Sequence, residues 1–144
     1  YLGLKQLGKD VDVVIPKFSK TFAFLPSINE IKTEGRMENY DLAIALDCSD
    51  INRLNGYASY FENAKETISI DHHSANKMFG DYNFVNPVAP ACVQILITIF
   101  EYLNTFIKID AKKIKTIIFP VPSKECPKSS HKSLLFFIVL APNP

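Results

Sequence analysis

Several residue types and patterns are scarce in this sequence. Among its 144 residues there is no tryptophan, and the three cysteines form no CxxC pair. An odd, scattered set of cysteines argues against a disulfide framework and against a cysteine-rich zinc site, and it favours a reducing, cytoplasmic location. The formal net charge is only +1, so no basic field predicts binding to long nucleic acid. An anionic substrate would have to be held by local charge or by a metal ion.

Long apolar runs are also missing. The longest late run, residues 134–140, is far too short to cross a bilayer as a helix, so we expect no membrane partner. The first four residues, YLGL, lack the basic start and apolar core of a secretory signal. Residues 1–8 are typical of the end of a helix with Gly8 as its stop, and the chain does not begin with Met. We therefore expect a fragment, large enough for one globular domain with a core.

Apolar segments alternate with helical patterns along most of the chain. The predicted strands are residues 11–15, 41–46, 67–70 and 83–85. The predicted helical segments are residues 22–25, 51–63 with an interruption at Gly56, 91–106, and 110–118. Strands that alternate with helices predict an α/β fold with a parallel sheet and flanking helices.

Two acidic residues come directly after predicted strands. Asp47 follows DLAIAL, and Asp71 follows TISI. In a parallel α/β sheet, sites form outside the carboxyl ends of the strands. We therefore expect Asp47 and Asp71 to be neighbours at one edge of the sheet.

The tripeptide Asp71-His72-His73 is the strongest candidate for chemistry. Carboxylates and imidazoles suit Mn, Zn or Fe as ligands. Adjacent histidines on a turn can point in different directions, so that one binds metal while the other hydrogen-bonds or donates to a substrate phosphate. The alternative is a polar loop with solvated histidines, and the strand ends at Asp47 and Asp71 weigh against it.

The residues around this tripeptide have simpler interpretations. Asp50 is expected to cap the helical segment that begins at Ile51, whereas Asp47 is expected to bind metal. Cys48 is expected to be a small buried residue rather than a ligand. Asn76 is a loop former by default, with contact to substrate as the alternative. The isolated basic residues are expected at the solvated surface: Arg36, Arg53 and Lys77.

The stretch ISIDHHSANKMFGDYNFVNPVAPACVQIL, residues 68–96, resembles the DHH phosphoesterase family, and within it the branch of small oligoribonucleases and 3'-phosphoadenosine-5'-phosphate (PAP) phosphatases. The upstream DLAIALDCSD resembles the second motif of the family. The resemblance covers roughly residues 1–118. Family II pyrophosphatases have the same kind of metal site, but the segment FGDYNFVNP resembles the oligoribonuclease branch more closely.

This resemblance implies a two-metal site, usually Mn²⁺, that hydrolyses short oligonucleotides (nanoRNA) or a phosphorylated nucleotide such as PAP. Asp47 resembles the bridging metal ligand, and His72 resembles a second metal ligand. His73 resembles the histidine that meets the substrate phosphate, so it is a catalytic and substrate-binding candidate. Asp71 resembles the motif acid that orients its neighbours and is the second catalytic candidate, and Asn76 is a candidate for substrate contact.

Parts of the family pattern are missing from this chain. The first motif would precede Tyr1, and the fourth motif, in a DTG-like context, would follow Ile118. We therefore predict a partial DHH domain over residues 1–118, incomplete at both ends, and an atypical tail over residues 119–144 that is out of frame or disordered. The alternative to an enzyme is a non-catalytic remnant or a nucleotide-binding module. The sequence leaves open a homodimer, and also the choice among nanoRNA, PAP and a cyclic dinucleotide.

Overall fold

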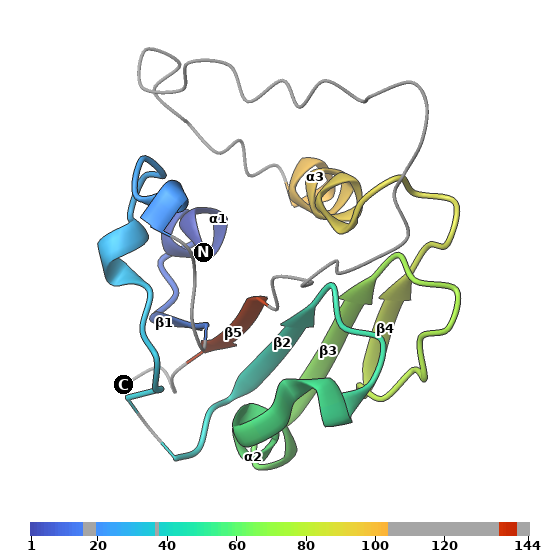
Figure 1. Cartoon of the computed structure of the whole chain (residues 1–144), viewed down its shortest axis with the longest axis horizontal. Coiled ribbons are helices and arrows are strands. Elements are labelled where there is room, and N and C mark those ends of the chain that lie inside the picture. Colours follow the sequence, from blue (N-terminus) through green and yellow to red (C-terminus); the bar gives the residue numbers. More distant parts are fainter. Residues whose placement is uncertain (16–19, 37, 104–135, 141–144) are drawn as a thin grey trace.

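A five-stranded sheet lies at the centre of the structure (Figure 1). The computed structural model describes residues 1–15, 20–36, 38–103 and 136–140. The strand order is β1-β5-β2-β3-β4, and β2, β3 and β4 run parallel. β5 is antiparallel to both β1 and β2, so β1 points in the same direction as β2. The strands are β1 (Val11–Val14), β2 (Leu42–Leu46), β3 (Glu66–Asp71), β4 (Tyr82–Val85) and β5 (Phe136–Leu140).

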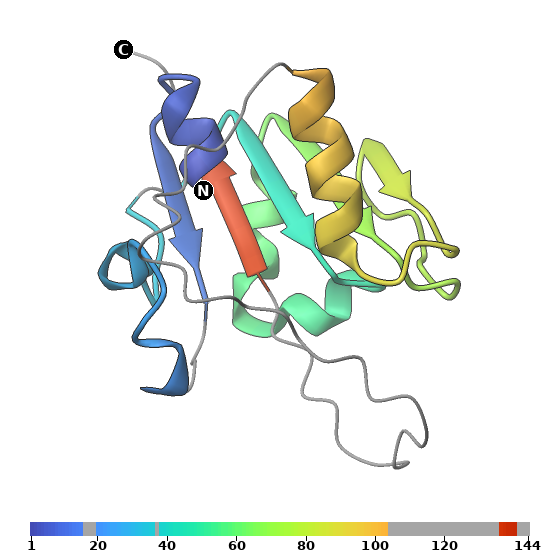
Figure 2. The same ribbon diagram turned by 90° about the horizontal axis from the view of Figure 1, so that it is seen from above.

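Helices cover both faces of this sheet, which confirms the α/β fold. Figure 2 shows α1 and α3 over one face and η3 with α2 behind the other. Side chains of β2 pack alternately against the helices on one face and on the other, because successive residues of a strand point to opposite faces of the sheet. The helical segments are α1 (Leu2–Gln6), η1 (Lys20–Phe22), η2 (Ile28–Glu30), η3 (Ile51–Tyr57), α2 (Ala58–Glu62) and α3 (Cys92–Tyr102).

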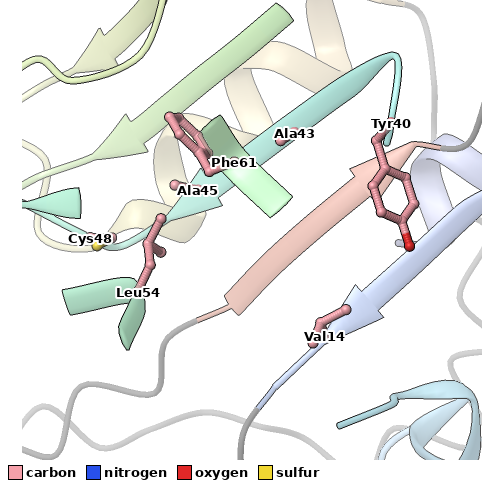
Figure 3. Close-up of a cluster of buried hydrophobic side chains, with 7 residues drawn as sticks. All are labelled: Val14, Tyr40, Ala43, Ala45, Cys48, Leu54 and Phe61. Atoms are coloured by element: carbon pink, nitrogen blue, oxygen red, sulfur yellow. The ribbon is translucent and has the colours of Figure 1, made fainter. Parts of the chain in front are cut away.

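Each face has its own buried cluster. Ala43 and Ala45 of β2 pack with Leu54 and Phe61, under η3 and α2 (Figure 3). Ile44 and Leu46 of the same strand pack on the α3 side, and the other buried members of that cluster are Val11, Val13, Ile15, Ile70 and Cys92. The small alanines let η3 and α2 approach the sheet closely. The two clusters fix β2 and β3 from both sides and so fix where their carboxyl ends lie.

Most of the predicted elements are present with small shifts. The first four strands match the predicted segments within one residue at nearly every end. The predicted break in residues 51–63 occurs at Asn55, which has φ 51° and ψ −128°, instead of at Gly56. Gly8 ends α1 with φ 72°, and the amide N–H groups of Gly8 and Lys9 donate to the carbonyls of Lys5 and Leu4. These two bonds are those of a Schellman motif, which favours glycine. The predicted helix over residues 110–118 lies outside the described residues.

β5 was not predicted. Residues 134–140 show neither helical spacing nor alternation, yet Phe136–Leu140 pairs with β1 and β2 along its whole length. A strand inside a sheet with both faces covered needs no alternation, so its sequence is a short uniform apolar run. The prediction of an atypical tail over residues 119–144 stays a prediction.

No helix in the described parts of the chain is long and apolar enough to span a membrane.

The loop before β4 is held by side-chain bonds to the start of β3. The Thr67 hydroxyl and backbone amide donate to the Asp81 carboxylate at 2.7 and 2.9 Å, and the Asp81 amide donates back to the Thr67 hydroxyl at 2.8 Å. The Asn83 side chain closes a ring with the backbone of Gly80. A Cβ on Gly80 would lie 2.9 Å from the Ser69 backbone nitrogen and 2.9 Å from the Tyr82 carbonyl oxygen. Only glycine fits this close approach of two backbones.

Replacing Gly80 with alanine is therefore expected to lower the free energy of unfolding by about 1–3 kcal/mol, because the added methyl group meets backbone atoms that cannot move aside easily. Urea unfolding followed by circular dichroism measures the change. Gly56→Ala is the matched control, since no atom of the described residues lies within 4 Å of its added Cβ. Equal stabilities for the two variants would contradict the prediction.

Candidate metal centre

The candidate site is built where β2 and β3 end. Asp47 follows β2, and its backbone amide donates to the Ile70 carbonyl at 2.9 Å, which extends the pairing of the two strands by one residue. Asp47 then leaves the sheet with φ 57°, in the left-handed region. Asp and Asn tolerate that region better than most residues, but it is still strained. The turn brings the Asp47 side chain over the end of β3.

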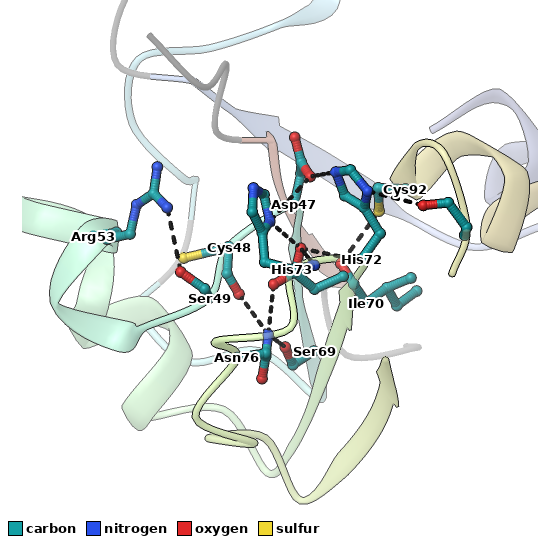
Figure 4. Close-up of polar contacts among 12 residues, drawn as sticks. Asp47, Cys48, Ser49, Arg53, Ser69, Ile70, His72, His73, Asn76 and Cys92 are labelled. Atoms are coloured by element: carbon teal, nitrogen blue, oxygen red, sulfur yellow. Dashed lines mark hydrogen bonds and ion pairs between the residues drawn. The ribbon is translucent and has the colours of Figure 1, made fainter. Parts of the chain in front are cut away.

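Three side chains face one another at this edge (Figure 4). One ligand atom each from Asp47, His72 and His73 can be chosen so that all lie within 4.8 Å of one another, and all three residues are partly buried. His72 Nε2 is 3.4 Å and His73 Nδ1 is 3.7 Å from Asp47 Oδ1. Asp47 Oδ1 is buried and has no hydrogen-bond partner among the residues that the structure describes. A buried acceptor is normally satisfied, so this oxygen is placed to bind a cation, or to accept from His72 when that ring is protonated.

The orientation of His72 is set by a backbone carbonyl. Its Nδ1 lies 3.1 Å from the Ala89 carbonyl oxygen, which can only accept, so the ring proton is on Nδ1. In the neutral ring, Nε2 then carries a lone pair that faces Asp47. The loop that supplies this carbonyl is itself fixed, because the Asn86 amide donates to the Asp71 carbonyl and the Ala89 amide to the Asn86 carbonyl. A histidine that ligates metal is commonly held in this way through its other nitrogen.

The Asp71 carboxylate is fully used by its neighbours. Its Oδ1 accepts from the backbone amides of His72 and His73 at 2.7 and 3.2 Å and from His73 Nδ1 at 2.7 Å. Its Oδ2 accepts from the Asn76 side-chain amide at 2.7 Å. Burial opposes ionisation of Asp71, but the bonds from Asn76, His73 and His72 outweigh it and hold its pKa below the ordinary value. Asp71 is thus a buried, charged carboxylate that orients the His-His turn through bonds to both of its oxygens.

His73 is oriented differently from its neighbour. Because Asp71 holds Nδ1, the Nε2 atom of His73 is the ring nitrogen that remains for an outside partner. The two rings are tilted by 55° with centroids 4.7 Å apart. The adjacent histidines are therefore held differently: His72 faces Asp47 through Nε2, and His73 is bonded to Asp71 through Nδ1.

Residues 1–120 match the family model described as DHH family, N-terminal domain. The chain belongs to the DHH family. This membership indicates a metal-dependent phosphoesterase, and the Asp47, His72 and His73 group is consistent with the metal.

The donor set of this DHH domain fits a divalent ion. It offers a carboxylate oxygen without a donor, an imidazole lone pair and a second imidazole, which together suit Mn, Zn or Fe. A cavity of about 590 Å³ has Asp47 among its lining residues. Apolar side chains dominate its walls, among them Tyr1, Leu46, Leu96 and Phe100.

Asn76 lies beneath the site. Its side chain bonds to Asp71, to the Cys48 carbonyl and to the Met78 amide. The structure brings it to the DHH tripeptide, as the sequence suggested, while its contact with substrate stays a prediction. The Asn76 bonds to Cys48 could not be seen in the sequence, since 28 residues separate the partners.

The remaining candidates have structural roles. Asp50 caps η3 by accepting from the Asn52 amide at 3.0 Å, as predicted, and pairs with Lys77. Cys48 is buried, as predicted, and burial raises the pKa of its thiol. Burial likewise raises the pKa of the Cys92 thiol, near Asp47, to about 11, so this thiol is protonated at neutral pH.

Arg36 lies at the surface, as expected, with its side chain 42% exposed, and it also forms ion pairs that were not expected. Its side chain binds the buried carboxylate of Asp12 and the exposed carboxylate of Asp10. The sequence signal that could have found this pair is Asp12 itself, an acidic residue inside the apolar strand segment VDVVI. A buried carboxylate requires a cationic or hydrogen-bonding partner.

Proposed function

We propose that this chain provides the metal-binding half of a Mn²⁺-dependent phosphoesterase that acts on short oligonucleotides (nanoRNA), on PAP, or on both. The unpartnered, buried oxygen of Asp47 beside the His72 lone pair is the observation that carries this proposal. An orphan acceptor of this kind costs free energy unless a cation or a donor occupies the space in front of it.

In this proposal Asp47 and His72 hold the ion. A bound divalent ion would neutralise phosphate charge and lower the pKa of a coordinated water. His73 presents Nε2 to the substrate phosphate because Asp71 holds Nδ1. Asp71 does not touch substrate but keeps His73 in that orientation. The two-metal arrangement implied by the family resemblance needs more ligands than the three groups found among the described residues.

The choice of substrate rests on the resemblance of residues 68–96 to the oligoribonuclease and PAP phosphatase branch. The net charge of +1 agrees with a small substrate held locally rather than with a long nucleic acid. A cytoplasmic location and a homodimer remain predictions.

The test is hydrolysis by the full chain with Mn²⁺. We expect release of mononucleotide from a 5'-phosphorylated dinucleotide, or of phosphate from PAP, with loss of turnover on chelation. Asp47→Ala and His72→Ala are expected to lose at least 100-fold in rate, since each removes a proposed metal ligand. Asn83→Ala, in β4, is the control and is expected to keep the wild-type rate.

The absence of turnover in the presence of measurable Mn²⁺ binding would contradict the enzymatic proposal for this chain. It would favour the alternative, a non-catalytic remnant or nucleotide-binding module. Binding of PAP without hydrolysis would identify the nucleotide-binding module. Turnover that survives both Asp47→Ala and His72→Ala would contradict the proposed ligands.

A further inference from the structure

We propose that Asn76 is a positioning residue that sets the geometry of the metal centre through two links, one to the Asp47 turn and one to His73. The proposal rests on the metal centre proposed above. Asn76 lies five residues after Asp71 and is partly buried. Its carboxamide lies between the end of β2 and the end of β3, below the group formed by Asp47, His72 and His73 (Figure 4).

The orientation of the Asn76 carboxamide is fixed by its partners. Nδ2 is 2.7 Å from Asp71 Oδ2 and 3.0 Å from the Cys48 carbonyl oxygen, and both of these groups accept. Oδ1 accepts from the Met78 amide at 2.7 Å. Reversing the amide would place donor against donor and acceptor against two acceptors. The short donations from Nδ2 and the acceptance by Oδ1 all go to protein groups. The carboxamide is therefore better suited to positioning these groups than to contacting substrate.

The first link runs to Asp47. Asp47 has a left-handed backbone, which persists only where the surroundings enforce it. Before the turn, the Asp47 amide is tied to the Ile70 carbonyl. After it, the carbonyl of the next residue, Cys48, accepts from Asn76, and the Ser49 carbonyl accepts from the Lys77 amide at 2.8 Å. Asn76 and Lys77 thus hold the exit of the turn that aims the Asp47 carboxylate.

The second link runs through Asp71 to His73. Asn76 is the donor to Asp71 Oδ2, while Oδ1 serves the His-His turn. Without the Asn76 bond the carboxylate could rotate about its bond to Cβ, and Oδ1 would lose its fixed position under His73 Nδ1. The His72 ring has an independent anchor in the Ala89 carbonyl. The proposal therefore expects His73 to respond to a change at Asn76 and His72 to respond much less.

Asn76→Asp isolates the donor bonds. The variant keeps the shape and keeps an acceptor for the Met78 amide, but it loses the Nδ2 donations to Asp71 and Cys48 and the longer one to Ser69 Oγ at 3.5 Å. Asn83→Asp is the matched control, because Asn83 is also partly buried, accepts from a backbone amide at 3.1 Å and donates to a backbone carbonyl at 2.6 Å, away from the site. Both variants add one negative charge. Added charge alone would strengthen cation binding, so weaker binding in Asn76→Asp reports lost geometry.

The experiment uses the full chain with two measurements. In the metal-free protein at pH 8, ¹⁵N-detected histidine spectra, assigned with single histidine variants, report which ring nitrogen carries the proton. Calorimetric titration with Mn²⁺ gives Kd at a temperature where circular dichroism shows each variant folded. In Asn76→Asp we expect His73 to lose its fixed Nδ1–H form and Kd for Mn²⁺ to rise about 10–100-fold. Asn83→Asp is expected to change neither.

Altered His73 signals in Asn76→Asp but not in Asn83→Asp support the link through Asp71 to His73. A higher Kd for Mn²⁺ in Asn76→Asp but not in Asn83→Asp supports the link to the Asp47 turn. Wild-type histidine signals together with wild-type or tighter Mn²⁺ binding in Asn76→Asp would overturn the proposal, and so would equal effects in Asn83→Asp. If Asn76→Asp does not fold, Asn76→Ala and Asn83→Ala replace the pair. A wild-type chain without Mn²⁺ affinity would defeat the proposed function, whereas the histidine spectra would still decide the positioning role.

Discussion

Replacing Asp12 with alanine is expected to lower the free energy of unfolding by about 3 kcal/mol. Asp12 lies in β1 and is 2% exposed. Its carboxylate accepts from the backbone and side chain of Arg36 at 3.1 and 2.6 Å and from the Tyr40 hydroxyl at 2.9 Å, and Lys32 lies at 3.4 Å. Alanine removes the common acceptor of these groups and detaches the segment that leads into β2. Arg36 and Lys32 are partly exposed and can regain water, which places the cost at the lower end for a broken buried pair.

Asp10→Ala is the matched control for this experiment. Asp10 accepts from the same Arg36 guanidinium at 2.7 Å, but its side chain is 46% exposed. Exposed ion pairs contribute little, so we expect a loss of about 0.5 kcal/mol. Urea unfolding at pH 7 measures both variants. Equal losses would show that Asp12 gains nothing from its buried position and would contradict the prediction.

The contribution of Asp12 is also expected to depend on pH. Burial opposes ionisation of this carboxyl, yet the bonds from Arg36 and Tyr40 lower its pKa below the ordinary value. A lowered folded-state pKa means that the stabilisation is complete above the unfolded-state pKa, about 3.9, and is lost as pH falls through the folded-state pKa. The stability difference between wild type and Asp12→Asn should therefore be constant from pH 7 to about pH 5 and shrink in stronger acid.

Local patterns in the sequence were sufficient for most of the fold. The segments VDVVI and DLAIAL are apolar, β-branched or small, and bounded by breakers, and they form β1 and β2. β5 could not be predicted in the same way, because a uniform run such as FFIVL fits a buried strand and a short helical segment equally well. Its position between β1 and β2 depends on pairing with residues about a hundred positions earlier, and no local period encodes such pairing.

The residues that form the candidate site could be predicted from the sequence, but their contacts with groups distant in the sequence could not. Two strand ends and a DHH tripeptide were enough to bring Asp47, His72 and His73 together. The Ala89 carbonyl that orients His72 was not predictable, because a backbone acceptor leaves no mark in the side-chain sequence. The contact of Asn76 with Cys48 and that of Arg36 with Asp12 were missed for a related reason, since the partners are 28 and 24 residues apart and meet only when the loops are packed.

Asp47→Asn is expected to separate metal binding from stability. In the metal-free chain, the buried Oδ1 of Asp47 has no donor, and His72 Nε2 faces it at 3.4 Å. Asparagine keeps the shape, tolerates the left-handed backbone and can turn its NH₂ toward the His72 lone pair. We therefore expect the metal-free variant to be more stable than wild type by about 1 kcal/mol. Thermal unfolding in the presence of a chelator measures this gain.

The same substitution is expected to abolish stabilisation by Mn²⁺. At a concentration of about 100 times Kd, a ligand that binds only the folded state adds about 2.7 kcal/mol. Wild type should gain this amount and Asp47→Asn almost none, so the order of stability reverses when Mn²⁺ is added. Asp50→Asn, in the same loop, is the control: it removes the charge that pairs with Lys77, keeps a side-chain oxygen to cap η3, and should keep the response to Mn²⁺. If Asp47→Asn is less stable than wild type without metal, the unpaired oxygen of Asp47 does not destabilise the metal-free protein, and the prediction is wrong.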